Sequence, residues 1–487
     1  MTSSGKAYAW GTTDRVVTSV ITTVGNIVLA RMLTTADFGL VAMVGIFIAI
    51  GYNLSNCGMI DGIIRKERPT ASDYSTMMLF NMAMGVVFCG TFIGLAAPVA
   101  SYLGHEELKG IMYAIGICFV VSTMSFSQEA RLRKELRMKE IAIVHVSSTA
   151  CAVTLGIVLA ACGMGYWALV SCRVFVNAFT TLFYLLVTRW MPRIAFSMKS
   201  FRELFGFGMH LMLAFLCRQV GTNINTFFLG QVSASQSGVY SQAQKTEEVP
   251  YAIVETSFVN TFYAVCSNEL DPERRRVLGL DMLRSMMFVG VAIAAVLMVV
   301  CRPMVVGVYG WQWEGAAPII RVLVVYGVIM LIKMSAQQVL KVHGMSKLIR
   351  NYTVAETVLQ VCILLAVWRR GVLWIAWSQV VPIAIFTVLY LRRYAMAEGV
   401  KAMPIVRHLV EGAVLPIVTG VVCGGVYLGL NALMVGCNAL VTVWVTFLVS
   451  SAVYALVLVA LCERQKPPYY MPVRAMALKA FGRKKKV

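Results

Sequence analysis

Apolar stretches recur along this whole chain, and each is long enough to cross a lipid bilayer as a helix. Fourteen stretches of roughly 18 to 28 residues are separated by short segments rich in Gly, Pro or charge. They lie at about 11–33, 37–63, 76–103, 109–127, 142–163, 166–188, 205–232, 237–265, 279–301, 316–342, 351–368, 371–391, 408–431 and 437–461. With a mean hydropathy of +0.75, the sequence predicts an all-α integral membrane protein.

The basic residues predict the orientation of these stretches. About three quarters of the 43 Lys and Arg residues fall in segments on one side of the alternating spans. The positive-inside rule therefore places both termini in the cytoplasm, which agrees with an even number of spans, and we expect a multi-pass membrane protein. Because topology explains most of the net charge of +20, no nucleic-acid partner is expected. The basic end at 483–486 is expected either to bind anionic lipid or to be disordered.

A basic segment between the fourth and fifth stretches has the pattern of an interfacial helix. Over 129–140 it offers the i,i+4 pairs Glu129/Arg133 and Glu135/Lys139. Leu132 and Leu136 would form its apolar edge.

Motifs for catalysis and cofactor binding do not occur in the sequence. The 13 cysteines form no C-x-x-C pair and no Cys/His cluster, and there is no phosphate-binding loop, nucleophile elbow or H-E-x-x-H motif. We expect no enzyme activity, no metal and no cofactor.

An internal repeat divides the chain. The segment 26–39 aligns with 225–238 at a separation of 199 residues, which matches six spans and predicts a parallel repeat. The expected architecture is two pseudo-symmetric six-helix lobes followed by two further helices. The expected boundaries are 1–200 for the first lobe, 201–400 for the second, 401–463 for the last two spans and 464–487 for a basic cytoplasmic tail.

Charged and amide side chains inside the stretches are the candidate functional residues, because a charge near the bilayer centre is costly unless it meets water or a partner. In 237–265, Glu248 and Glu255 share one helical face and Lys245 lies a short arc away. The candidates in other stretches are Arg15, Asp61, Arg218, Asn223, Asn225 and Lys333. Two interpretations remain open: a wet anion cavity whose acidic groups titrate, or buried ion pairs that fix the packing.

Three segments resemble a known family of transporters. Leu29–Gly39, Asn53–Glu67 and Asn225–Tyr240 are similar to the Wzx-type lipopolysaccharide and capsule flippases, especially the colanic-acid-exporter branch. These flippases belong to the multidrug/oligosaccharidyl-lipid/polysaccharide exporter superfamily. The resemblance covers the first twelve stretches, whereas the last two agree only in hydropathy.

The resemblance implies transport of a polyprenyl-diphosphate-linked oligosaccharide to the periplasmic leaflet by alternating access. It implies basic cavity residues at Arg15, Arg31, Arg65 and Arg218, and a polysaccharide polymerase and glycosyltransferases as partners. Asp61 departs from the branch, which more often has an uncharged residue there. The superfamily's cation-coupled drug antiporters are the alternative. In either case a proton or sodium gradient would act through Asp61, Glu248 or Glu255.

Overall fold

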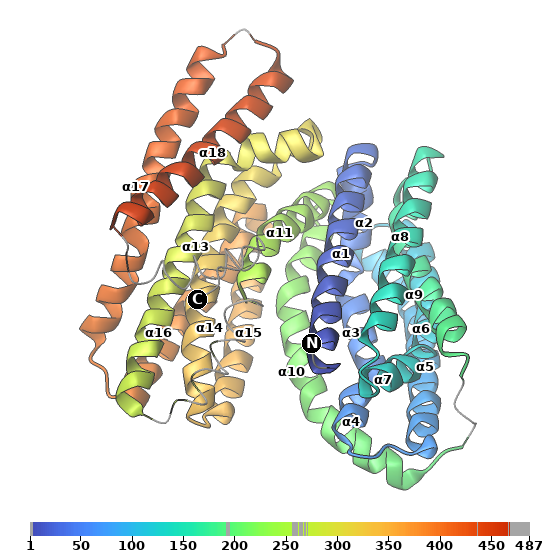
Figure 1. The fold of residues 1–487 in the computed structure, drawn as a ribbon. Coiled ribbons are helices and arrows are strands. Elements are labelled where there is room, and N and C mark those ends of the chain that lie inside the picture. Colours follow the sequence, from blue (N-terminus) through green and yellow to red (C-terminus); the bar gives the residue numbers. More distant parts are fainter. Residues whose placement is uncertain are drawn as a thin grey trace. The chain divides into compact units, whose positions relative to one another are not determined.

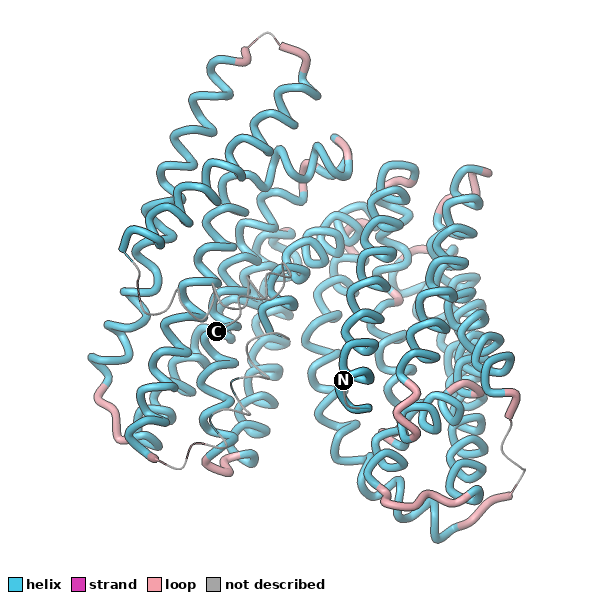
Figure 2. The backbone as a smooth tube through the Cα atoms, in the orientation of Figure 1, coloured by secondary structure: helices cyan, strands magenta, loops and turns pink. Residues whose placement is uncertain are grey.

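The computed structural model consists of helices joined by short loops over the part of the chain that it describes (Figure 1). It describes residues 3–190, 195–255, 262, 266, 269, 271–435, 437–465 and 467, with the side chains of 3–9, 53 and 207–218 left out. Figure 2 shows no strand in these ranges. The all-α prediction is therefore confirmed.

The helices follow the predicted stretches closely. They are α1 (Ser3–Met32), α2 (Thr35–Met43), α3 (Gly45–Asn56), α4 (Met59–Arg65), α5 (Ala71–Leu103), α6 (Glu107–Thr123), α7 (Phe126–Lys134), α8 (Met138–Ala161), α9 (Tyr166–Thr188), α10 (Met198–Gly230), α11 (Ala234–Val254), α13 (Pro272–Tyr309), α14 (Ala316–Val342), α15 (Ser346–Val367), α16 (Val372–Glu398), α17 (Ala402–Leu433) and α18 (Ala439–Gln465). Short 3₁₀ turns lie at η2 (Trp311–Trp313) and η3 (Trp368–Arg370).

Eleven helices in the described ranges are long and apolar enough to span a membrane, and the bent α2–α4 segment raises this to as many as 12. The polar helices α10 and α11, which cover the seventh and eighth predicted stretches, are not among the eleven. A multi-pass membrane protein is confirmed, whereas the count of fourteen spans stays a prediction.

Two helices of the N-terminal half begin with the same capping device. Thr34 caps α2 and Thr70 caps α5, and in each case the threonine side chain accepts a hydrogen bond from the backbone N–H of an aspartate three residues later. The carboxylates of Asp37 and Asp73 in turn accept a hydrogen bond from the backbone N–H of the threonine, so both helices start with a capping box.

The chain forms two compact units, Met1–Ser241 and Gln242–Val487. In the first unit, Met43 of α2, Phe92 of α5 and Met112 of α6 belong to one buried apolar cluster. A second cluster brings together Met59 of α4 and Leu204 of α10. Helix α10, which we expected to open the second lobe, thus packs with helices of the first unit. The predicted division at residue 200 remains untested as a functional boundary.

The second unit repeats the packing order of the first. Helices α5 and α6 pack together as α13 and α14 do, α8 and α9 as α15 and α16 do, and α6 on α9 as α14 on α16. The last two helices, α17 and α18, pack on α13, where Phe288, Leu415 and Cys462 form a buried cluster. This repetition is consistent with the parallel internal repeat.

The interfacial helix predicted over 129–140 is wrong in its extent. Helix α7 ends at Lys134, and α8 begins at Met138 after a turn in which Leu136 has a φ of 55°. The Glu129–Arg133 ion pair is confirmed at 2.6 Å. Glu135 instead binds Arg131 and Arg137, because the turn directs it away from the position that a continuous helix would give.

Candidate functional site

Helix α1 presents three different faces along its membrane-spanning length. The face at positions 14, 17, 21 and 25 is turned toward α8, on which α1 packs. A second face carries Val16, Val20 and Val24, each more than half exposed, as expected for contact with lipid. A third face is polar, and it lies between the other two.

The polar face is a stripe of side chains at spacings of three and four residues. Its members are Thr12, Arg15, Ser19, Thr22 and Asn26. The first four are exposed within the first unit and Asn26 is half-buried. A guanidinium about one and a half turns into a membrane span requires water or an anion beside it. Hydroxyl and amide groups next to that charge can form hydrogen bonds with a polar ligand.

Three further candidates lie at helix ends of the first unit. Arg31 is exposed in the last turn of α1, and Asp61 and Arg65 are exposed one turn apart on α4. The structure does not bring these residues together with Arg15 in one contact. Arg218 lies on α10, and its side chain is outside the described residues.

The two asparagines of α10 serve the packing of the first unit. Asn225 is fully buried, and its amide donates a 2.9 Å hydrogen bond to the hydroxyl of Tyr240 on α11. Asn223 is half-buried and donates a hydrogen bond to the carbonyl of Gln219. The burial of Asn225 gives it a structural role in this conformation, whereas Asn223 stays a candidate for sugar binding.

On α11 the buried carboxylate is a residue that the sequence did not single out. Glu248 and Lys245 are exposed and Glu255 is half-buried, but Glu247 is only 5% exposed. Glu247 shares a buried face with Tyr251, and its carboxylate lies against Gly327 of α14. The signal was present in the spacing of Ala243, Glu247 and Tyr251, since an i, i+4, i+8 series lies on one helical face.

Lys333 has a partner that sequence reasoning missed. Its ammonium lies 2.8 Å from a carboxylate oxygen of Glu356 on α15, and both side chains are 14% exposed. The carboxylate of Glu356 neutralises the positive charge of Lys333. That charge was the reason for expecting Lys333 to bind the substrate. For Lys333, then, the interpretation as a buried ion pair describes the geometry.

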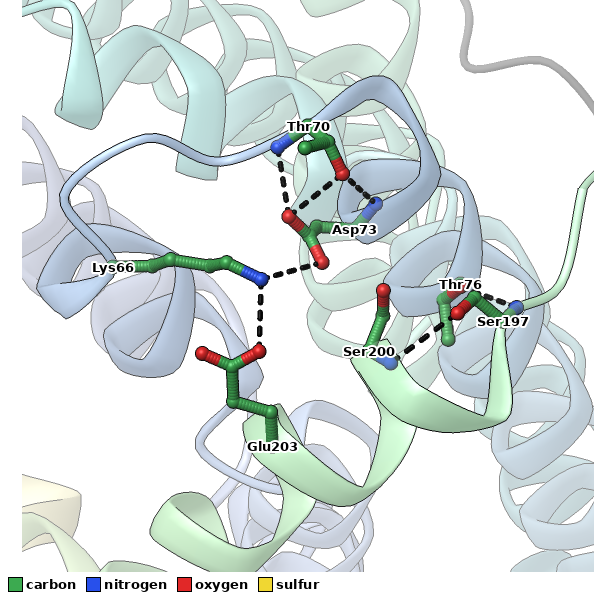
Figure 3. A network of polar contacts seen from close by, with 7 residues as sticks. All are labelled: Lys66, Thr70, Asp73, Thr76, Ser197, Ser200 and Glu203. Atoms are coloured by element: carbon green, nitrogen blue, oxygen red, sulfur yellow. Dashed lines mark hydrogen bonds and ion pairs between the residues drawn. The ribbon is translucent and has the colours of Figure 1, made fainter.

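A polar network closes one end of the first unit (Figure 3). Lys66 lies 3.0 Å from Asp73 at the start of α5 and 2.9 Å from Glu203 near the start of α10. The hydrogen bond to Glu203 does most to raise the pKa of Lys66, partial burial lowers it, and Asp73 raises it further, with a net increase above the ordinary value. By the predicted topology this network lies on the cytoplasmic side.

The same figure shows how the start of α10 is fixed. The backbone N–H of Ser197 donates to the hydroxyl of Thr76, and the N–H of Ser200 donates to the hydroxyl of Ser197 (Figure 3).

The ammonium of Lys134, at the end of α7, donates to the backbone carbonyls of Ile64 and Lys66. The loop after α4 is therefore held from two sides.

The basic turn after α7 is neutralised by its own acidic residues. Glu135 lies 2.8 Å from Arg131 and 3.1 Å from Arg137, and Arg137 also lies 2.6 Å from Glu140. Partial burial acts to raise the pKa of Glu135, but the hydrogen bonds from Arg131 and Arg137 outweigh it and lower that pKa.

Among the described residues, no group of three or more His, Cys, Asp or Glu could hold a metal ion.

Arg15 is thus an exposed charge within a polar stripe on an otherwise apolar span. Residues 28–318, more than half of the chain, match the polysaccharide biosynthesis protein family. This chain belongs to that family.

Curated relatives agree with the polysaccharide biosynthesis family. The chain is 25% identical over 310 residues to the lipopolysaccharide biosynthesis protein WzxC of Escherichia coli (strain K12), with 62% of each chain covered. It is 22% identical over 304 residues to the succinoglycan biosynthesis transport protein ExoT of Rhizobium meliloti (strain 1021), covering 61% of this chain and 60% of that one. The alignments thus span about three fifths of these two relatives.

Solved structures of membrane transporters share the fold of this family member. The inward closed conformation of the lipid II flippase MurJ superposes with a TM-score of 0.72 at 10% identity, covering 93% of this chain and 100% of that one. An inward-facing multidrug resistance MATE family transporter superposes with a TM-score of 0.62 at 16% identity, covering 80% of this chain and 100% of that one. At these identities the likeness shows the fold.

Proposed function

We propose that this protein is a flippase for a polyprenyl-diphosphate-linked oligosaccharide in the biosynthesis of a surface polysaccharide. It moves the glycan across the bacterial inner membrane by alternating access, with both termini in the cytoplasm. A polysaccharide polymerase and glycosyltransferases act with it, and a proton or sodium gradient drives the cycle.

The observation that carries this proposal is the Arg15 stripe on α1. A diphosphate must exchange its water for cationic and hydrogen-bonding groups as it enters the membrane, and a guanidinium binds phosphate oxygens in pairs. Ser19, Thr22 and Asn26 continue the stripe along the span and offer partners to sugar hydroxyls. The lipid tail requires no polar site, because it can remain in the bilayer.

The balance of exposed charges favours an anionic substrate over a cationic drug. The exposed basic residues within the described parts of the predicted stretches include Arg15, Arg31, Arg173, Lys245 and Arg321. The exposed acidic candidates are Asp61 and Glu248. A cavity built for a cation would present the opposite balance.

The test replaces Arg15 in a strain that lacks its own flippase for a surface polysaccharide. Arg15→Gln should lower the surface polysaccharide about tenfold or more at unchanged protein abundance, the loss expected for a charge-assisted hydrogen bond. Arg15→Lys should retain part of the activity, because it keeps the charge but loses the paired geometry. Arg274→Ala is the matched control, since Arg274 is 77% exposed on a segment predicted to face the cytoplasm.

Native mass spectrometry provides the second readout. The purified wild-type protein should carry a polyprenyl-diphosphate glycan, and Arg15→Gln should carry less. Normal export by Arg15→Gln at normal abundance would remove Arg15 from the site. Failure of the wild-type protein to support export, together with the absence of a copurified glycan, would refute the function.

A further inference from the structure

A chain of hydrogen bonds connects three helices of the first unit directly behind the Arg15 stripe. Asp14 of α1 lies 3.0 Å from Nδ1 of His145 on α8. Nε2 of the same ring lies 3.0 Å from the hydroxyl of Tyr184 on α9. Both ring nitrogens are thus engaged, and the imidazole joins α1 to α9 through α8.

The partners determine where the imidazole carries its proton. An ionised carboxylate can only accept, so Nδ1 carries the hydrogen and donates it to Asp14. In the neutral ring Nε2 is then an acceptor, and the Tyr184 hydroxyl donates to it. The hydroxyl of Thr18 donates to the other carboxylate oxygen of Asp14 at 3.2 Å. The neutral network therefore has a donor for every acceptor named here.

Addition of one proton reverses the second hydrogen bond. A proton taken up at Nε2 makes the imidazole a donor at both nitrogens, and Tyr184 must then accept. The positive ring also forms an ion pair with Asp14, so α1 becomes bound more firmly to α8. Release of the proton from Nε2 restores the neutral arrangement.

The Tyr184 end of this hydrogen-bond chain is buried and lies near charged groups of other helices. Tyr184 is fully buried against Leu132 and Ile141. The Glu129–Arg133 ion pair on α7 acts electrostatically on Tyr184, as does Tyr52 on α3.

Two neighbours complete the charged groups around this position. Asp61 on α4 acts electrostatically on Arg133, and Arg15 follows Asp14 in the chain, on the adjacent face of α1. The carboxylate of Asp14 itself is bound by His145 and Thr18.

The three groups lie near one boundary of the membrane. Tyr184 is about one turn before the end of α9 and His145 about two turns after the start of α8. Asp14 is about one turn into the apolar span that begins at Trp10. In the predicted topology all three positions are close to the cytoplasm, where a transported proton would be released.

We propose that Asp14, His145 and Tyr184 form the proton-binding site that couples the proton gradient to transport by this protein. The inference rests on the proposed function and specifies its driving ion as the proton. Protonation of His145 changes how firmly α1 is held by α8, and α1 carries Arg15. Proton binding and substrate binding are thereby linked through adjacent faces of one helix.

The first experiment observes the imidazole without requiring transport. The purified protein contains five histidines, and histidine labelled with ¹³C and ¹⁵N allows each ring to be observed by NMR. Loss of one signal set in His145→Asn assigns His145. We expect hydrogen on Nδ1 alone in alkaline samples and on both nitrogens after acidification. Asp14→Ala removes the acceptor and should shift hydrogen from Nδ1 to Nε2, and an unchanged spectrum would overturn the proposal.

The second experiment measures export against external pH. Wild-type cells should export severalfold more polysaccharide at about pH 6 than at about pH 8, because the inward proton gradient is larger. His145→Asn should export little at either pH, and Tyr184→Phe, which keeps the aromatic packing, should show a reduced response. His408→Asn is the control, because the ring of His408 binds the carbonyl of Pro404 on α17 in the second unit.

The outcomes separate this inference from the proposed function. A pH response in His145→Asn equal to that of the wild type, at equal abundance, would exclude His145 as the coupling site while leaving the flippase intact. Absence of export and of copurified glycan in the wild type would instead refute the flippase. A sodium requirement with no pH response would overturn the inference alone.

Discussion

Gly39 and Gly238, 199 residues apart, occupy equivalent places in one reciprocal helix contact. A Cβ on Gly39 would overlap the carbonyl oxygen of Ala234, and a Cβ on Gly238 would overlap the carbonyl oxygen of Thr35. Thr35 and Ala234 are themselves 199 residues apart, so the two halves of the contact are related by the internal repeat. The hydroxyls of Thr35 and Ser235 add a 2.7 Å hydrogen bond. Two-fold related surfaces contact each other in this reciprocal way.

We predict that Gly39→Ala and Gly238→Ala destabilise the protein by similar amounts. Each added methyl group meets backbone rather than a flexible side chain, so the helices must separate, at a cost of about 1–3 kcal/mol. The measurement is the thermal unfolding midpoint in detergent. Gly90→Ala on α5 is the control, because a Cβ there meets no atom within 4 Å. Equal midpoints for all three variants would show that the contact opens without cost.

The Lys66 network predicts a dependence on alkaline pH. The pKa of Lys66 is raised in the folded protein, mainly by the hydrogen bond to Glu203. Its contribution to stability is therefore complete below the ordinary lysine pKa and is lost as pH rises through the raised value. The difference in unfolding midpoint between wild type and Lys66→Met should be constant near neutral pH and shrink above about pH 10.5.

Lys66→Arg is the matched variant for this prediction, because arginine remains charged at such pH values. It should keep its midpoint relative to Lys66→Met across the whole range. Since Glu203 is half exposed, we expect the effect to be small, as for other solvated ion pairs. A difference between wild type and Lys66→Met that grows with pH would contradict this account.

Hydropathy predicted the helices well because every span needs an apolar stretch long enough to cross the lipid bilayer. The predicted stretch 316–342 has the bounds of α14, and 166–188 has those of α9. The break at Leu136 was missed, since a left-handed turn of a non-glycine residue has no signal in a pattern of apolar and charged positions.

The candidate site was harder to predict because a helical period identifies faces but not their neighbours. Glu248 and Glu255 share a face as expected, yet the face that α11 buries is that of Glu247 and Tyr251. The sequence did not mark Asp14 as a candidate site residue. Its partner His145 is 131 residues away, a contact that no local pattern contains.

We predict that two neighbouring carboxylates of α11 differ in their effects on stability and on export. Glu247→Gln should raise the unfolding midpoint by several degrees or leave it unchanged, because the charged form of a carboxylate 5% exposed is costly to bury. Glu248→Gln should leave the midpoint unchanged, since that side chain is exposed. The same pair tests coupling. A loss of export in Glu248→Gln but not in Glu247→Gln would give the exposed residue a part in coupling in addition to His145.

The last prediction concerns the ion pair between Lys333 and Glu356. Lys333→Met alone leaves a largely buried carboxylate without its counterion, and we expect a loss of about 3–5 kcal/mol in unfolding free energy together with low membrane abundance. Lys333→Met combined with Glu356→Leu removes both charges and should recover most of that loss, because apolar packing replaces a costly buried pair. The measurements are the unfolding midpoint and surface polysaccharide in the same strain. If the pair is structural, the double variant exports normally, whereas a stable, abundant double variant that fails to export would return Lys333 to the substrate site. Lys347→Met, at the first turn of α15, is the control for removing a lysine from the same unit.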